Sequence, residues 1–426
     1  MPEQPLSEAS ASLSFDAFRS TVLTDYRLAM LSREASLLGR REVLGGKAKF
    51  GIFGDGKEVA QVAMAKFFQP GDFRSGYYRD QTFMLAAGLT TVRELFAQLY
   101  ADPDPAHEPA SSGRQMNAHF STPFLDEKGD WLPLTQLKNV SADSSPTAGQ
   151  MTRALGLAFA SKSFREIPAL HTLIELSNQG NEVCFATIGD ASTSEGHFWE
   201  TINAAGVLQV PLAVFVWDDG YGISVPKKYQ TTKGSISEAL AGMQADADKT
   251  GLRIYTVKGW DYAACCEVFE EGIRMARQYH TPVIFHVEEL TQPQGHSTSG
   301  SHERYKSEDR LQWETRWDGL HKMREWVLNN GLANENELAT LEQEVADQVR
   351  RERTEAWEQF NEPIRLQVTQ AADLIESLAK ACPEQTNAIQ QLAADLRANR
   401  TPLRREVMRT LYRVLDLVGN NEAAFW

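Results

Sequence analysis

The chain has 426 residues, of which 42% are hydrophobic and 23% are charged, and its formal net charge is -14. This length and composition predict a folded protein with one large core and additional helical material. The negative charge, which no long run of Lys or Arg offsets, disfavours nucleic acid and anionic membrane surfaces as partners. No apolar run is long enough for a membrane-spanning helix.

The first residues are polar and acidic, without the basic start and apolar stretch of a signal peptide. We expect residues 1–14 to be disordered. The four cysteines show no pattern of a disulfide framework, and we interpret them as reduced thiols. Together these features predict a cytoplasmic protein.

Two helices are predicted before the region that carries the sheet. Helical spacing runs from Phe15 to Val43, and a second helix from Lys57 to Phe68 ends before Pro70. Asp55, between two glycines, is assigned to a turn or a helix cap. Residues 102–147 are rich in Pro, Ser, Gly and Asp without clear periodicity, and we expect this long segment to line a binding site.

From Thr147 onward, helices and apolar runs alternate. The pattern predicts strands at 183–188, 212–217, 253–257 and 283–288, with helices at 147–164, 192–208 and 261–280 between them. Such alternation implies right-handed crossovers and a doubly wound parallel sheet, an α/β fold.

The rest of the chain is predicted to be helical. After about Leu311 the sequence is nearly all charged helix, with breaks at Cys382-Pro383 and Thr401-Pro402. We therefore expect an α/β domain at residues 15–330 and an all-helical extension or connector at 331–426.

Two successive strands are predicted to end on acidic residues. The strand at 183–188 runs into Gly189-Asp190, and the strand at 212–217 runs into Asp218-Asp219. Each acid alone is most simply a helix cap or a turn residue. Because ligands bind at the carboxyl ends of parallel strands, the two ends together predict an oxygen-ligand site suited to Mg²⁺.

The residues after Asp190 suggest how an anion is bound beside this metal. Ser192 and Glu195 have the spacing of a capping box, so a helix amino terminus that favours phosphate is expected there. No GxGxxG follows a strand, which disfavours a nicotinamide cofactor.

Four collinear segments resemble a known family. The stretch GDASTSEGHFWETINAAGVLQVPLAVFVWDDGYGIS resembles the thiamine diphosphate motif (GDG, some twenty-odd residues, NN) of the α subunit of 2-oxoacid dehydrogenases, the decarboxylating component. Further similarity lies in GYYRDQ (76–81), in GRQMNAHF with SSPTAGQ (between 113 and 150), and in QGHSTSGSHERYK (294–306). The resemblance spans roughly residues 15–330 and implies a thiamine diphosphate-binding fold. GRQM followed by His119 is closer to the branched-chain (3-methyl-2-oxobutanoate) members than to the pyruvate members.

The resemblance implies roles for individual residues. The Mg²⁺ ligands would be Asp190, Asp219 and the carbonyl of Tyr221. Residues that would bind the cofactor, thiamine diphosphate, are Tyr78 and Arg79 at the diphosphate, Gly189, Ala191 and Ser192 in the GDA loop, and Ser145, Pro146 and Thr147 beside the aminopyrimidine. His296 matches the family's active-site histidine, which positions substrate and assists acyl transfer, and His119 matches a second histidine near the substrate.

Without the motif, several of these residues have simpler interpretations. His296 in a serine-rich loop is then an exposed side chain, and Arg79 is a surface ion pair worth little. His197 and His286 match no role, and we expect them to be structural.

The chain departs from the family pattern at several positions. Ala191 replaces the second glycine of GDG, and aspartates replace both asparagines, so Asp219 adds a negative charge that favours Mg²⁺ but repels diphosphate. Trp217 stands where branched-chain relatives have a phosphate-binding arginine, so Arg79 and the helix terminus must hold more of the anion. Gly149 replaces a threonine of a potassium site, and Asp218 has no assigned role.

The family's activity is oxidative decarboxylation of a 2-oxoacid with acyl transfer to a lipoyl-bearing acyltransferase component. The resemblance implies an α₂β₂ assembly, or a fused β half, because a β subunit supplies the glutamate that activates the cofactor. The chain alone is expected to be inactive, and the sequence leaves open whether it is a separate subunit or a truncated fusion. Alternatives are a pyruvate or 2-oxoglutarate enzyme, a catalytically silent thiamine diphosphate-binding scaffold or regulatory subunit, and a transketolase-like enzyme, which the GHSTS loop disfavours.

Overall fold

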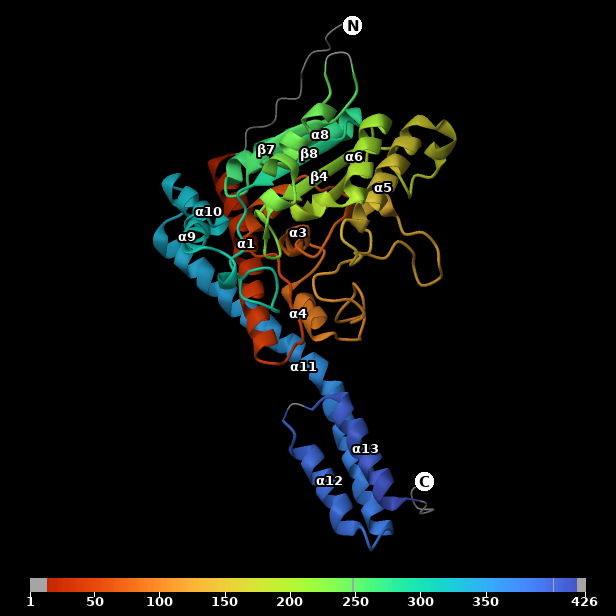
Figure 1. Cartoon of the computed structure of the whole chain (residues 1–426). Coiled ribbons are helices and arrows are strands. Elements are labelled where there is room, and N and C mark those ends of the chain that lie inside the picture. The colour runs from red at the N-terminus through yellow and green to blue at the C-terminus, as the bar shows by residue number, and fades with distance from the viewer. Residues whose placement is uncertain (1–13, 247–248, 401, 420–426) are drawn as a thin grey trace. The chain divides into compact units, whose positions relative to one another are not determined.

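The computed structural model describes residues 14–246, 249–400 and 402–419 (Figure 1). The predicted disordered N-terminus lies outside the described residues except for Ser14, whose side chain caps the first helix by accepting a hydrogen bond from the Ala17 amide at 3.2 Å. The chain divides into two compact units, one through Glu352 and the other from Arg353. The helices are α1 (Phe15–Leu44), α2 (Glu58–Ala65), α3 (Gln81–Ala86), α4 (Val92–Tyr100), α5 (Gly149–Glu166), α6 (Gly196–Leu208), α7 (Ile236–Ala239), α8 (Tyr262–Tyr279), α9 (Glu308–Arg316), α10 (Gly319–Asn329), α11 (Glu335–Ala381), α12 (Thr386–Ala398) and α13 (Arg404–Val418).

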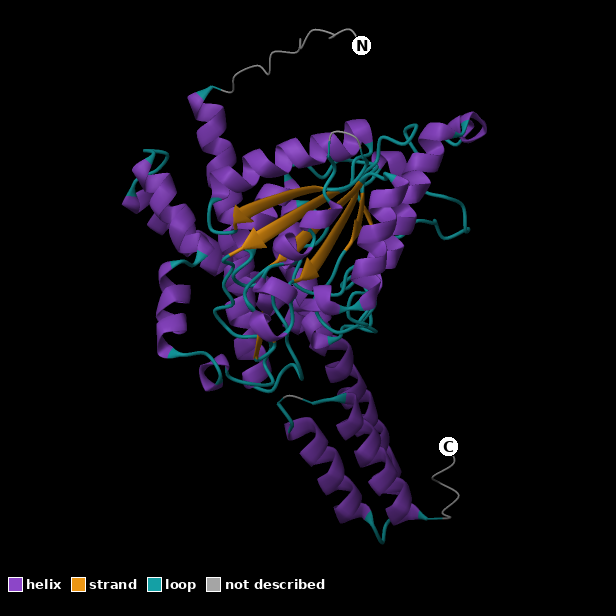
Figure 2. Cartoon of the chain, turned by 45° about the horizontal axis from the view of Figure 1, so that its top comes forward, coloured by secondary structure: helices purple, strands orange, loops and turns teal. Residues whose placement is uncertain are grey.

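Among the described residues of the first unit, six parallel strands form one twisted sheet in the order β2-β1-β3-β4-β8-β7 (Figure 2). The strands are β1 (Phe73–Ser75), β2 (Asn139–Val140), β3 (Cys184–Gly189), β4 (Leu212–Trp217), β7 (Arg253–Lys258) and β8 (Val283–Glu288). This confirms the predicted doubly wound α/β fold. From β1 the chain adds β2 on one side and then returns to add β3 on the other, so the strand order reverses between β1 and β3.

Alternate residues of β4 pack against different layers, which explains its unbroken apolar sequence. Ala213, Phe215 and Trp217 belong to a core cluster shared with α2, α3 and α8, whereas Val214 and Val216 pack into a cluster with α5 and α6. A central parallel strand is covered by helices on both faces, so neither set of side chains reaches water.

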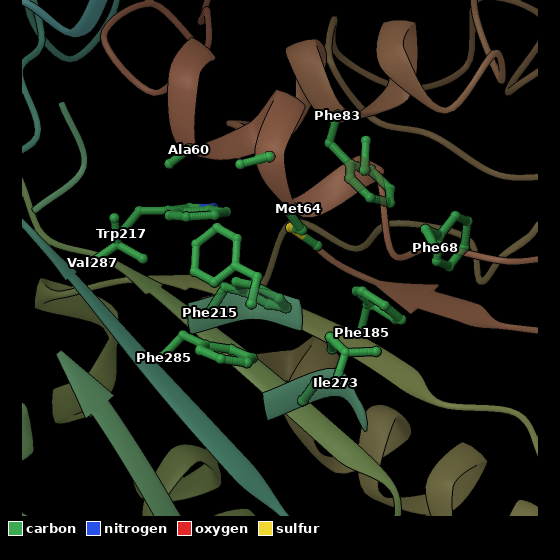
Figure 3. Close-up of a cluster of buried hydrophobic side chains, with 14 of the residues drawn as sticks. Ala60, Met64, Phe68, Phe83, Phe185, Phe215, Trp217, Ile273, Phe285 and Val287 are labelled. Carbon is green, nitrogen blue, oxygen red and sulfur yellow. The ribbon is translucent and has the colours of Figure 1, made fainter. Parts of the chain in front are cut away.

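Phe215 is the centre of the first of these clusters (Figure 3). Its ring stacks on Phe285 with centroids 4.6 Å apart, meets Phe269 edge-on at 5.1 Å, and lies 5.7 Å from the ring of Trp217. Aromatic burial of this kind fixes β4 and β8 relative to α8. The carboxyl end of β4 is thereby held in place.

The structure contradicts one local prediction and agrees with another. The capping box was wrong: Ser192 lies in a 3-10 turn, Ala191–Ser194, and α6 begins only at Gly196 after Glu195, which makes no side-chain cap. Asp55 lies in a turn, as predicted, and its carboxylate accepts a hydrogen bond from the Gln294 amide at 2.9 Å.

The second unit contains the later part of α11 together with α12 and α13. Its core includes Ile375, Ile389, Leu396 and Val414. The helical extension was predicted to start at residue 331, but Leu332 and Leu338 pack in the first unit against α1 and α10, so the division falls later. No helix in the described ranges has both the length and the apolar composition that crossing a membrane requires.

Candidate active site

The loops that follow β1, β3 and β4 meet at the carboxyl edge of the sheet, where the strand order reverses. In open α/β sheets this reversal opens a crevice for ligands. Here it is a cavity of about 360 Å³. Its walls are formed by Tyr77, Tyr78, Arg79, Thr147, Gly189, Asp190, Ala191, Ser192, Trp217, Asp219, Tyr221, Gly222, Ile223, Gln292 and His296.

Most residues that the sequence assigned to a site line this cavity. The exceptions are His119, Ser145 and Pro146, which are not among the lining residues. His119 is buried, and its Nε2 lies 3.4 Å from the Ser145 hydroxyl. Residues 102–147 were expected to line a binding site, and the last of them, Thr147, lies in the cavity wall.

Asp190 is a buried carboxylate whose Oδ2 has no hydrogen-bond partner among the described residues. Burial raises the pKa of Asp190 well above its usual range, and the neighbouring carboxylates of Asp219 and Asp218 raise it further. A buried acid in this state is stabilised by a cation that coordinates its oxygen. The donor set of Asp190, Asp219 and the Tyr221 carbonyl therefore fits Mg²⁺.

Unlike Oδ2 of Asp190, both carboxylate oxygens of Asp219 accept hydrogen bonds. Its Oδ2 accepts a hydrogen bond from the ammonium of Lys57 at 2.7 Å, and its Oδ1 accepts one from the Tyr221 amide at 3.2 Å. Burial alone would raise the pKa of Asp219, but the charges of Lys57, Arg79 and Lys306 outweigh burial and lower it. Asp219 is therefore ionised without any metal.

Asp218, for which the sequence predicted no role, does not line the cavity and stabilises the turn after β4. Its Oδ2 accepts from the Lys227 ammonium at 2.6 Å and lies 2.9 Å from Nε2 of His286, while Oδ1 accepts from the Gly220 amide at 2.9 Å. His286 thus has the structural role expected of it. Gly220 has φ +81°, which a residue with a side chain rarely adopts.

Arg79 and His296 form one unit at the cavity wall. The Arg79 guanidinium donates to the Phe53 carbonyl at 2.5 Å and to the His296 carbonyl at 2.8 Å, and its Nη2 lies 3.0 Å from Nδ1 of His296. Because arginine only donates, Nδ1 must be the acceptor, so the neutral ring carries its hydrogen on Nε2. Burial, followed by the charge of Arg79, lowers the pKa of His296 to about 4.

Sequence reasoning missed five wall or support residues: Lys57, Tyr77, Gly222, Ile223 and Gln292. Lys57 was assigned only to a helix start, yet α2 is buried along its whole length, and a cation at a helix amino terminus opposes the helix dipole. A lysine opening so apolar a helix was the signal that it had a buried acidic partner. The other four have no comparable signal, since neutral residues beside a motif are common.

Two departures from the family pattern have local explanations. Trp217 is buried, lines the cavity with a neutral ring, and donates from Nε1 to Asp80 at 3.3 Å, so it brings no positive charge to an anion. Ala191 needs a glycine opposite it, because a Cβ at Gly222 would come 2.7 Å from the Cβ of Ala191.

Comparison with known proteins agrees with this geometry. The family model described as "Dehydrogenase E1 component" matches residues 26–364. The chain is 27% identical to the 2-oxoisovalerate dehydrogenase subunit alpha of Bacillus subtilis (strain 168), over 76% of this chain and 86% of that protein. It is also 27% identical to the mitochondrial 2-oxoisovalerate dehydrogenase subunit alpha of Caenorhabditis elegans, over 71% of this chain and 62% of that protein, and 27% identical to the pyruvate dehydrogenase E1 component subunit alpha of Acholeplasma laidlawii, over 78% and 82%. The family match covers most of the chain and includes every residue that lines the cavity. The chain therefore belongs to the dehydrogenase E1 component family.

Proposed function

We propose that this chain is the α-type subunit of a thiamine diphosphate-dependent dehydrogenase that decarboxylates a 2-oxoacid, most specifically a branched-chain one. The observation that carries the proposal is the meeting of Asp190 and Asp219 in one cavity with Arg79 and His296. Family membership and the similarity to two 2-oxoisovalerate dehydrogenase α subunits support it. The similarity to a pyruvate dehydrogenase α subunit keeps pyruvate as the competing substrate.

The cavity residues divide by chemistry. Asp190, Asp219 and the Tyr221 carbonyl would hold Mg²⁺, because carboxylate and carbonyl oxygens are its preferred ligands. Tyr78, Arg79, Gly189, Ala191 and Ser192 would bind the diphosphate, and Ser145, Pro146 and Thr147 would flank the aminopyrimidine. When bound, thiamine diphosphate supplies the carbanion chemistry that decarboxylation needs.

His296 acts as a neutral hydrogen-bond donor in this proposal. Arg79 occupies Nδ1, so Nε2–H is the group that the ring offers to an oxygen of the substrate. Because its pKa is lowered to about 4, the ring stays neutral at pH 7 and does not attract the substrate carboxylate by charge. Its contribution is orientation of the substrate and of the acyl group during transfer.

The remaining partners follow from the family resemblance. We infer a β-type subunit, in an α₂β₂ assembly or as a fused half, and a lipoyl-bearing acyltransferase component that receives the acyl group. Cys184, Cys265 and Cys266 are thiols rather than disulfides, which supports work in a reducing compartment such as the cytoplasm.

The decisive test is turnover of the full chain combined with its β-type partner, thiamine diphosphate, Mg²⁺ and lipoamide. We expect CO₂ release from 3-methyl-2-oxobutanoate to exceed release from pyruvate and 2-oxoglutarate. His296→Asn should lower turnover, whereas His197→Asn, at an exposed histidine away from the cavity, should not. Release of no CO₂ from any 2-oxoacid would overturn the proposal, and cofactor binding without turnover would identify a silent scaffold.

A further inference from the structure

Lys57 is a buried charged residue for which the proposed function has no role. The side chain is 1% exposed. Its ammonium donates to Asp219 Oδ2 at 2.7 Å, to the Thr291 carbonyl at 2.9 Å and to Gln292 Oε1 at 3.1 Å. An ammonium has three donors, so all of them are used and the charge is fixed in one place.

The charge balance of the metal site explains why a lysine is needed there. A carboxylate at position 219 carries a negative charge that the asparagine of the family motif does not. Together with Lys57, however, Asp219 forms a pair with no net charge. The side-chain amide of an asparagine at this position would also be uncharged. The pair therefore removes the repulsion that an extra carboxylate would exert on a diphosphate.

We propose that Lys57 is a positioning residue of the metal site, whose ammonium neutralises Asp219 and orients its carboxylate toward the cation. This inference rests on the proposed function, because it assigns Asp219 to a Mg²⁺ site beside a diphosphate. The carboxylate keeps its capacity to coordinate, since each of its oxygens has two lone pairs and Lys57 uses one of them. The partnerless Oδ2 of Asp190 supplies the other side-chain ligand.

Two effects disfavour a cation at the position of Lys57. It precedes α2, where the helix dipole repels a cation, and it is removed from water. Glu58, the next residue, does not compensate it, because its carboxylate is bound to Arg33 at 2.6 Å. Asp219 is therefore the acid that makes a buried ammonium tolerable at this point.

Loss of Lys57 should have different effects on ligand binding if it is only part of a structural ion pair than if it neutralises a metal ligand. Removing a structural pair loosens the cavity and weakens every ligand alike. Removing a counter-charge makes the site one unit more negative, so a cation binds more tightly and an anion more weakly. Opposite effects on the two ligands are therefore the signature of the proposed role.

The test uses the full chain and calorimetry with two probes, Mg²⁺ alone and inorganic pyrophosphate in saturating Mg²⁺. Pyrophosphate carries the negative charge of the cofactor's diphosphate. In Lys57→Gln we expect Mg²⁺ to bind about tenfold more tightly and pyrophosphate about tenfold more weakly, since charges this close interact strongly. In Asp219→Asn, which leaves the ammonium alone, Mg²⁺ should bind more weakly.

The double variant Lys57→Gln/Asp219→Asn restores neutrality, and both affinities should return to within about threefold of wild type. Lys66→Gln is the control, because Lys66 also pairs with an aspartate at 2.7 Å, but that aspartate, Asp25, does not line the cavity as Asp219 does. It should leave both affinities unchanged. If Lys57→Gln does not fold, the double variant decides alone, and loss of both affinities in it overturns the assignment.

Other outcomes separate the two proposals. If wild type binds both probes but Lys57→Gln weakens both or changes neither, the role of Lys57 is overturned while the proposed function stands. If the losses of affinity in the two single variants add up in the double variant, the role of Lys57 is also overturned. If wild type binds neither probe, the role of Lys57 is overturned, whereas the proposed function is decided separately by turnover with the β-type partner.

Discussion

After burial, direct contact with the Arg79 cation is the second cause of the lowered pKa of His296. The guanidinium lies 3.0 Å from Nδ1, and burial together with this charge lowers the pKa of the ring to about 4. In Arg79→Gln the cation is gone but burial remains, so we expect the pKa of His296 to rise part of the way toward its usual value near 6.5. A histidine titration followed by NMR measures this shift.

His197 provides the internal reference for that titration. It is exposed and outside the cavity, so its titration should be the same in wild type and in Arg79→Gln. An unchanged His296 titration in the variant would mean that Arg79 does not determine the state of the ring.

Arg74 holds together the loops that carry the cavity residues. It is 0% exposed, and its guanidinium contacts Asp80 at 2.6 Å, Asp143 at 3.0 Å and the Tyr77 carbonyl at 3.0 Å. Arg74→Met would leave two carboxylates buried without their cation. We expect the free energy of unfolding to fall by about 3–5 kcal/mol, measured by urea denaturation.

The double variant Arg74→Met/Asp143→Asn tests the cause of that loss. Removing one of the uncompensated acids should recover part of the stability, because the cost lies in the buried charge and not in the missing guanidinium volume. If the double variant is less stable than Arg74→Met, packing rather than charge explains the effect.

The sequence predicted those site residues whose position follows from the sheet. Asp190 and Asp219 come directly after apolar strands, and parallel strands bring such ends together at one edge. The contact between Lys57 and Asp219 could not be predicted in this way. The two residues are 162 positions apart, and Lys57 follows a turn whose sequence has no periodic pattern. His119 was assigned by resemblance, and the cavity wall does not include it.

At the scale of elements, the strands long enough to show an apolar run were predicted, whereas the helix α4 was not. β3, β4, β7 and β8 have six residues each, and their apolar runs identified them. β1 has three residues and β2 has two, too few for an alternating pattern. The helix start predicted at Ser192 was wrong because Ala191–Ser194 form a 3-10 turn before α6 begins at Gly196.

The end of α8 offers a pH-dependent prediction. His280 ends this helix with φ 53°, its Nε2 lies 2.8 Å from the Gly180 carbonyl, and burial lowers its pKa to about 4. The unfolded chain, with a histidine pKa near 6.5, then binds more protons between about pH 6.5 and pH 4. Stability due to this residue is present above pH 6.5 and is lost as the pH falls through that window.

His280→Asn removes the titrating group while keeping a residue that tolerates positive φ. We expect the fall in unfolding free energy between pH 6.5 and pH 4 to be smaller in the variant by about 1–3 kcal/mol. His296 titrates over the same range in both proteins, so its contribution cancels in the comparison. Parallel pH profiles for the two proteins would show that His280 is not protected from protons in the folded state.

At the scale of the whole molecule, every cavity residue lies in the first unit, which ends within α11 at Glu352. The early part of α11 belongs to that unit: Glu342 accepts from the Tyr26 hydroxyl at 2.7 Å, and Leu338 is completely buried in a core with α1 and α10. The second unit has a core of its own. Folding and Mg²⁺ binding should therefore depend on where α11 is cut.

A chain truncated after Glu352 keeps the whole core of the first unit. We expect its melting temperature, measured by circular dichroism, to stay within about 4 °C of the full chain, and its Mg²⁺ affinity to be unchanged. A chain truncated after Gly331 is the matched control, because it also loses Leu332, Leu338 and the partner of Tyr26. That chain should melt at least about 8 °C lower or fail to fold, since buried apolar contacts and a buried hydrogen bond are removed together. Equal stability of the two truncated chains would contradict the assignment of residues 332–352 to the first unit, and loss of Mg²⁺ binding in the longer one would show that the site depends on the second unit.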